Sequence, residues 1–169
     1  WFEVATYAKP AYEIAVTPDR EALFTGETVN FRVRATFFEG TPVPGMKLNY
    51  RIYGEAGSVT TDVNGEAVIS YTPPHVPESW GWGGSLPLYV TGGEPELGEV
   101  TEERWIPLFH RDVMAETDTA WSGDQATVTV QVNQVVLDEL LAGTGTDVKG
   151  PALADRAVEF TLFEYTWNR

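Results

Sequence analysis

Hydrophobic and polar residues alternate along most of this chain of 169 residues. The clearest alternation runs through residues 29–52, on both sides of a connector at residues 40–45. Its apolar positions are Val29, Phe31, Val33, Ala35 and Phe37, then Met46, Leu48, Tyr50 and Ile52. A period of two places such side chains on one face of a strand. The pattern predicts strand, turn and strand, with both strands facing one apolar core.

Shorter alternating runs follow the same rule on either side of this stretch. They occur at residues 12–16, 58–61, 66–71, 86–90 and 100–106. Together with residues 29–37 and 46–52 they give about seven strands, with a turn signal every 8–12 residues, which is typical of a β-sandwich. In the run at 100–106 apolar residues fall on both sides, so its inward face stays open.

Two local signals predict how particular strands are placed. Pro87 predicts a sheet edge for residues 86–90, because proline has no N–H to donate to a neighbouring strand. Asp62-Val63-Asn64-Gly65 is the strongest turn signal, because Asn-Gly readily supplies the positive φ angles of a β-hairpin. We therefore expect a hairpin whose return strand is residues 66–71.

The order of elements recurs about 100 residues later, as weak internal repetition. Residues 112–116, the Gly123-Asp124 turn and the alternating run 126–132 repeat the earlier order of strand, Gly-acid turn and long strand. Residues 135–141 are the only plausible helical turn, and a strand is predicted at 158–162. This second unit looks truncated, so we expect an exposed sheet edge and a chain cut from a longer protein.

Composition excludes several classes of function. The net charge is −14, from 25 acidic and 11 basic residues, and such a field repels nucleic acid and anionic membrane surfaces. The acidic residues are scattered, which favours solubility over cation binding. There is no cysteine, and hence no disulfide or thiolate site. No apolar run approaches the ~18 residues of a membrane helix, so direct membrane insertion is not expected.

Three stretches carry a resemblance to a known family. They are FEVATYAKPAYEIAV at residues 2–16, ATFFEGTPVPG at 35–45 and TDVNGEA at 61–67. The first is similar to the junction between successive macroglobulin-like domains of the alpha-2-macroglobulin family, the second to that domain's Gly-x-Pro-Val-x-Gly turn, and the third to its later T-D-x-x-G-x-A motif. The chain is identified as resembling a bacterial member of this family.

The resemblance implies an all-β fold, in which a seven-stranded antiparallel sandwich of the immunoglobulin or fibronectin kind is followed by a second, truncated sandwich unit. Residues 1–9 would be a terminal strand or linker from a preceding domain. Residues 10–108 would be the macroglobulin-like sandwich, and residues 109–169 the incomplete start of another.

The resemblance also implies a function. The chain would be non-catalytic scaffold in an extracytoplasmic (periplasmic, cell-surface or secreted) protein that traps proteases, with no cofactor. Its partners would be adjacent domains of the same polypeptide, and target proteases would meet the full-length protein. Because the chain has no cysteine, a thioester of the family's Cys-x-x-Gln type cannot form within it.

Trp80 and Trp82 are the sharpest candidates for a contact site. Two indoles separated by one glycine could form a stacking platform for a sugar, as in a carbohydrate-binding or adhesin-type sandwich. They could equally cap the sandwich or pack against a neighbouring domain. The sequence favours capping or interdomain packing and leaves ligand binding as the alternative.

Other candidate sites have ordinary interpretations. His75 and His110 are the only histidines, and with Ser79 or Ser85 they could be drawn as a triad, but no nucleophile signature supports one. The oxygen ligands at residues 62–66 resemble a calcium loop only faintly and lack its distal acid. We therefore expect no enzyme activity, no metal site and no cofactor.

Overall fold

The computed structural model describes residues 11–76, 81, 83–94, 98–159 and 161. These residues form eleven strands and one short helix. The chain is therefore all-β, as the alternation predicts, and its arrangement in sheets is consistent with a β-sandwich. Predictions for residues 1–10, including the first strand of the family junction, lie outside the described residues.

The first eight strands form two sheets. One sheet has three antiparallel strands in the order β1 (Tyr12–Pro18), β3 (Val29–Phe37) and β6 (Glu66–Tyr71). The other has the order β2 (Leu23–Phe24), β8 (Gly98–Phe109), β7 (Gly83–Glu94), β4 (Lys47–Ile52) and β5 (Glu55–Thr60). Among the described strand pairs of these two sheets, only β2 and β8 run parallel. We call these two sheets the N-terminal sheet pair.

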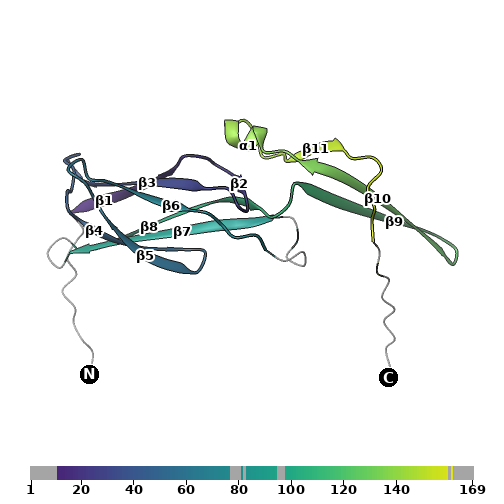
Figure 1. Cartoon of the computed structure of the whole chain (residues 1–169), viewed down its shortest axis with the longest axis horizontal. Helices are drawn as coiled ribbons and strands as arrows, with labels where there is room; N and C mark the ends of the chain where they lie inside the picture. The colour runs from purple at the N-terminus through teal and green to yellow at the C-terminus, as the bar shows by residue number, and fades with distance from the viewer. Residues whose placement is uncertain (1–10, 77–80, 82, 95–97, 160, 162–169) are drawn as a thin grey trace, which may run out of the picture.

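The two sheets of the pair lie in facing layers (Figure 1), and they share one hydrophobic core. Its fully buried side chains include Phe31 and Val33 from β3 and Leu48 from β4. The alternating stretch thus places its two strands in opposite sheets, facing the same core, as predicted. The buried residues of this core are Tyr12, Ile14, Leu23, Val29, Phe31, Val33, Ala35, Val43, Met46, Leu48, Ile52, Ile69, Tyr71, Leu86, Leu88, Val90, Ile106 and Leu108.

The inward face of β8, which the sequence leaves open, is the one that carries Ile106 and Leu108. Both side chains are fully buried, and Val100 packs against the same core. Trp105 lies on the opposite, outward face of this strand.

The prediction that Pro87 marks a sheet edge is wrong. β7 is an interior strand, with β8 on one side and β4 on the other. Its pairing with β4 begins only at Leu88, which is opposite Ile52. Pro87 therefore lies just beyond the end of β4, where the missing N–H leaves no ladder bond unmade on that side.

The predicted Asn-Gly hairpin is also wrong. β5 and β6, which flank residues 61–65, lie in different sheets, so the turn crosses from one sheet to the other. Only Gly65 has a positive φ there, at 73°. The tight hairpin is instead between β4 and β5, where Tyr53 and Gly54 both have positive φ angles of 47° and 88°, as a two-residue type I′ turn requires.

A third sheet follows the pair and is called the C-terminal sheet. It has the order β11 (Lys149–Ala152), β10 (Gln125–Val135) and β9 (Val113–Ser122), all antiparallel. The β9 and β10 hairpin projects away from the sheet pair (Figure 1). Helix α1 (Asp138–Ala142) overlaps the helical turn predicted at residues 135–141 and extends one residue beyond it; its C-cap is Gly143, whose φ is 65°.

Candidate functional site

The sequence-predicted contact residues Trp80 and Trp82 lie outside the described residues, as does Ser79. Whether they form a platform or cap the core stays a prediction. The other candidate residues, His75, Ser85, His110 and residues 62–66, are all described.

His75 and His110 have separate local surroundings. The Nδ1 atom of His75 is 3.2 Å from the hydroxyl oxygen of Thr25, and its ring packs over Gly26, where a Cβ would be only 2.8 Å from Nε2. The ring of His110 lies beside Gly84. In the part of the chain that is described, neither histidine is hydrogen-bonded to Ser85. These residues therefore do not form a triad there.

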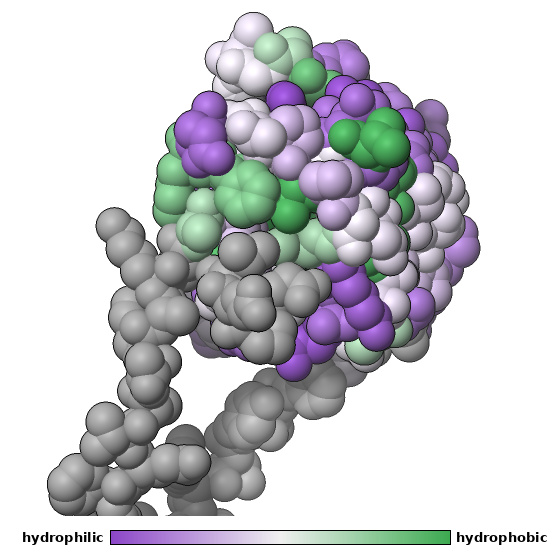
Figure 2. Space-filling model, turned by 90° about the vertical axis from the view of Figure 1, so that its left-hand side faces the viewer, coloured by the Kyte–Doolittle hydropathy of each residue, from purple (hydrophilic) through white to green (hydrophobic). Residues whose placement is uncertain are grey.

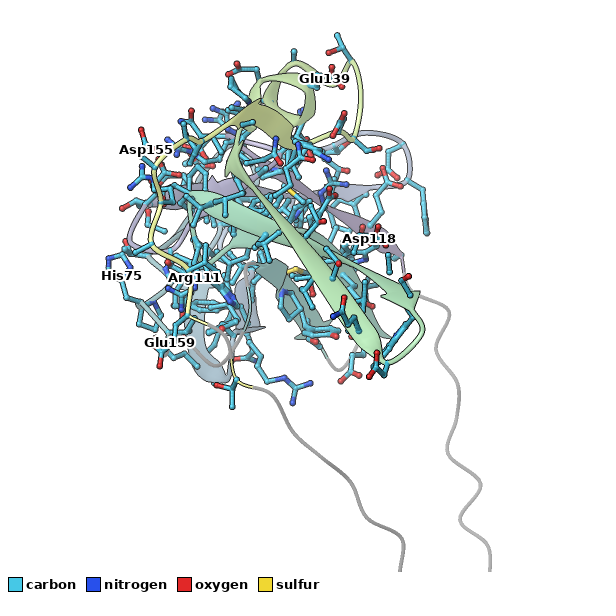
Figure 3. The ribbon with its side chains drawn as sticks, turned by 90° about the vertical axis from the view of Figure 1, so that its right-hand side faces the viewer. His75, Arg111, Asp118, Glu139, Asp155 and Glu159 are labelled. Carbon is cyan, nitrogen blue, oxygen red and sulfur yellow. The ribbon has the colours of Figure 1, made fainter. Side chains whose placement is uncertain are left out.

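The labelled titratable residues are spread around the molecule when it is seen from its C-terminal-sheet side (Figure 3). Glu139 comes from α1, Asp118 from β9, and both lie apart from His75 in this view. Within the described ranges, no group of three or more His, Asp or Glu side chains could hold a metal ion. In those ranges no helix has the length and apolar character to cross a membrane.

The acidic turn at residues 62–66 uses its carboxylate within the turn itself. One carboxylate oxygen of Asp62 accepts hydrogen bonds from the backbone N–H groups of Glu66, at 2.9 Å, and Asn64, at 2.8 Å. These bonds, that from Glu66 first, lower the pKa of Asp62 below its ordinary 3.8 and outweigh the opposing effect of desolvation. The arrangement is that of a turn, which supports the interpretation preferred from the sequence.

The two family stretches at residues 35–45 and 61–67 pack against each other at one end of the sheet pair. The hydroxyl of Thr61 is buried between them: it donates to the carbonyl oxygen of Val43 at 2.7 Å and accepts from the N–H of Met46 at 2.9 Å. The N–H of Gly45 also donates to the carbonyl of Thr61. We call these contacts the motif cluster.

Gly65 completes the motif cluster through its backbone. Its carbonyl accepts a hydrogen bond from the N–H of Ala35 at 2.8 Å. A Cβ at this position would be 2.5 Å from the carbonyl oxygen of Ala35, so only glycine fits. The motif residues that carry the family resemblance therefore have a structural role, namely to fix the crossings between the two sheets.

Seen from the end farthest from the C-terminal sheet, the surface has a small gathering of hydrophobic residues bordered by hydrophilic ones (Figure 2).

A shallow groove of about 530 Å³ lies on the outer face of the three-stranded sheet and includes Arg32, Arg34 and Asp19. Burial alone would raise the pKa of Asp19, but hydrogen bonds from Asn30 and the charge of Arg20 outweigh it, and the pKa is lowered. Both carboxylate oxygens of Asp19 thus accept hydrogen bonds from Asn30, one from its backbone N–H and one from its side-chain amide.

A second hydrophobic cluster joins the N-terminal sheet pair to the C-terminal sheet. Phe24 and Phe109 from the pair meet at a ring-centroid distance of 6.0 Å. From the other side come Val135 and Leu137, both buried. We call this cluster the junction; its members are Ala22, Phe24, Phe109, Met114, Val135, Leu137, Leu140 and Val148.

Backbone hydrogen bonds reinforce the junction on both sides. The N–H of Thr25 donates to the carbonyl of Phe109 at 2.9 Å, which fastens the β2 segment to the end of β8. The N–H of Val135 donates to the carbonyl of Asp112 at 2.8 Å, and that of Val136 donates to Val148 at 3.0 Å. Burial of several apolar side chains stabilises such a contact by roughly 1.5–3 kcal/mol for each fully buried side chain. No sequence pattern predicts this cluster, because its members come from four separate segments of the chain.

Comparison with known proteins decides the family. The chain is 37% identical over 124 residues, 68% of its length, to an alpha-2-macroglobulin from Thermotoga maritima. The resemblance to the alpha-2-macroglobulin family is confirmed. The chain spans about 8% of the length of that alpha-2-macroglobulin. No protein-family profile matches the chain.

Among solved structures, the chain is similar to the CARDB domain of the PF1109 protein from Pyrococcus furiosus, determined in complex with di-metal ions. The sequences are 14% identical, the alignment covers 62% of this chain and 97% of that domain, and the TM-score is 0.37. At that score the likeness to the CARDB domain carries no argument beyond the alpha-2-macroglobulin match.

Proposed function

We propose that this chain is a non-catalytic structural scaffold within a bacterial alpha-2-macroglobulin-like protein that traps proteases. In this proposal residues 10–108 are a macroglobulin-like sandwich of seven strands with the two-residue β2 added. Residues 109–169 are the start of a second such unit. The parent protein is extracytoplasmic, and target proteases meet it as a whole.

The junction is the observation that carries the proposal. A scaffold must hold successive units in a fixed orientation, and a buried apolar cluster with backbone hydrogen bonds on both sides does so. Interfaces that are small and polar let domains move independently, whereas a buried apolar contact couples them.

The test measures the orientation of the two units in solution. Residual dipolar couplings from amides in β3 and in β10 should fit one alignment tensor for the unaltered chain. Leu137→Ala removes a buried side chain from the junction and should cost about 2–5 kcal/mol of packing, so the two units should align independently. Leu141→Ala is the matched control, because Leu141 is 49% exposed and lies outside the junction.

Two results would count against the scaffold proposal. One is a pair of unrelated alignment tensors in the unaltered chain, which would mean that the junction does not hold. The other is saturable binding of a glycan that disappears in Trp80→Ala and Trp82→Ala variants, which would favour the carbohydrate-binding alternative.

A further inference from the structure

The outward face of the five-stranded sheet carries an exposed tryptophan, Trp105, close to Glu103 and Tyr89. Trp105 on β8 is 62% exposed, although its neighbour Ile106 is fully buried in the core. The register places Trp105 opposite Pro87, and Glu103 opposite Tyr89. Because alternate residues of a strand share a face, these four side chains lie on the same outward surface.

The same surface already holds one cation on an aromatic ring. Arg51 on β4 is paired with Tyr89 across the strands, and its guanidinium carbon is 5.4 Å from the centre of the Tyr89 ring. That distance is within the range of a cation–π contact. The indole of Trp105 is the better acceptor for such a contact, and in the described part of the chain no aromatic or cationic group covers it.

Glu103 supplies a negative charge beside the open indole. It lies two residues before Trp105 on the same face of β8, at a strand spacing of about 6.8 Å. No hydrogen bond or ion pair engages its carboxylate among the residues that are described. The chain as a whole has a net charge of −14, and such a field draws cationic partners toward the surface.

We propose that Trp105 and Glu103 form a docking site for an arginine side chain of a partner polypeptide. The planar guanidinium stacks on the indole face, and its N–H groups donate to the carboxylate of Glu103. Arginine fits better than lysine because its flat, weakly hydrated head can stack and hydrogen-bond at once. Tryptophan and arginine are also the residues that most often dominate protein interfaces.

This site is independent of the scaffold proposal. It lies on the outward face of the sheet pair, whereas the junction is a buried cluster built from other residues. Loss of arginine binding would leave the alignment of the two units unchanged, and loss of that alignment would leave this binding intact.

The experiment is an NMR titration of the full 169-residue chain with the peptide acetyl-Gly-Arg-Gly-amide. The same peptide with citrulline, the neutral isostere of arginine, is the matched probe. The arginine peptide should shift the indole N–H signal of Trp105 and the amide of Glu103, and citrulline should shift neither. Added salt should weaken the arginine effect, because the site is exposed.

Substitutions locate the site. Trp105→Ala should weaken binding by about two- to fivefold, the size of an exposed cation–π contact. Trp121→Ala is the control, because Trp121 is 74% exposed but lies on β9. Glu103→Gln should also weaken binding, whereas Glu99→Gln, four residues earlier on β8, should not.

Three results would overturn the proposal. The first is equal binding of the citrulline peptide, and the second is equal weakening by Trp121→Ala, which would indicate unspecific attraction. The third is a neutral oligosaccharide that shifts the Trp105 signal when the arginine peptide does not. That result would assign the ring to sugar stacking instead.

Discussion

A Cβ atom on Gly65 would lie 2.5 Å from the carbonyl oxygen of Ala35, a backbone atom that cannot move aside. The N–H of the same alanine donates to the carbonyl of Gly65. This close approach joins the turn after β5 to the middle of the motif cluster, and it makes the position directly testable.

Gly65→Ala should strongly destabilise the fold. The φ of Gly65 is 73°, which costs an alanine about 1–2 kcal/mol, and the clash with Ala35 adds about 1–3 kcal/mol. Gly45→Ala separates the two effects, because Gly45 has a φ of 72° but open space around its Cβ position. Urea denaturation should show the larger loss for Gly65→Ala; equal losses would mean that the contact is not tight.

Thr61→Val should destabilise the motif cluster through unmade hydrogen bonds. Valine keeps the shape but leaves the buried N–H of Met46 and carbonyl of Val43 without the hydroxyl, at a cost of about 1–3 kcal/mol per group. Thr60→Val, at the exposed neighbouring position, should change the unfolding free energy by less than about 0.5 kcal/mol. Similar losses in both variants would argue against the buried hydroxyl.

Gly92→Ala and Gly93→Ala should differ although the residues are adjacent on β7. A Cβ on Gly92 would point into the core, 2.9 Å from atoms of Ile14 and Leu48, and should cost about 1–3 kcal/mol. A Cβ on Gly93 would only touch Glu99 at 3.7 Å, so that change should be neutral or slightly stabilising. Thermal unfolding of both variants gives the comparison, and a reversed order would contradict the register of β7.

Asp62 should contribute stability that depends on pH. Its pKa is lowered in the folded chain, so its contribution is fully present above the ordinary pKa of 3.8 and is lost as pH falls through the folded value. The difference in unfolding free energy between the unaltered chain and Asp62→Asn should therefore shrink below about pH 4. Urea denaturation across pH 6 to 3 measures it.

Asp62→Ala provides the control for that experiment. It removes the acceptor for the N–H groups of Asn64 and Glu66 at every pH, so it should stay less stable than Asp62→Asn throughout. A gap between the unaltered chain and Asp62→Asn that did not change with pH would show that the carboxylate charge is unimportant.

Alternation in the sequence predicts the strands of the N-terminal sheet pair and their shared core, because alternation reports burial directly. It does not predict β11 (Lys149–Ala152), and residues 158 and 159, where a strand is predicted, are not in one. It does not predict how strands are partnered. Asn64-Gly65 has the residues of a hairpin turn, yet the positive φ pair falls on Tyr53-Gly54, where a tyrosine that also packs against the core gives no turn signal. Tertiary packing there outweighs local preference.

Contact sites formed by residues far apart in sequence give no local signal. Trp80 and Trp82 do give one, because they are close in sequence, and they lie outside the described residues. The junction could not be predicted, since Phe109 and Leu137 meet only after the chain has folded. The sequence alone does not show which face of β8 is buried, so it cannot say whether Trp105 points inward or outward. The burial of Ile106 in the structure places Trp105 on the surface.

The course of β8 has a mechanical consequence. This one strand holds the core at Ile106 and Leu108, supplies Phe109 to the junction, and precedes β9 by three residues. Tension on the C-terminal sheet therefore enters along the axis of a strand that is bonded to β7 over its whole length. A pull along β8 would load all the hydrogen bonds between β7 and β8 at once, in shear, instead of breaking them one at a time. The strand therefore resists separation of the two units.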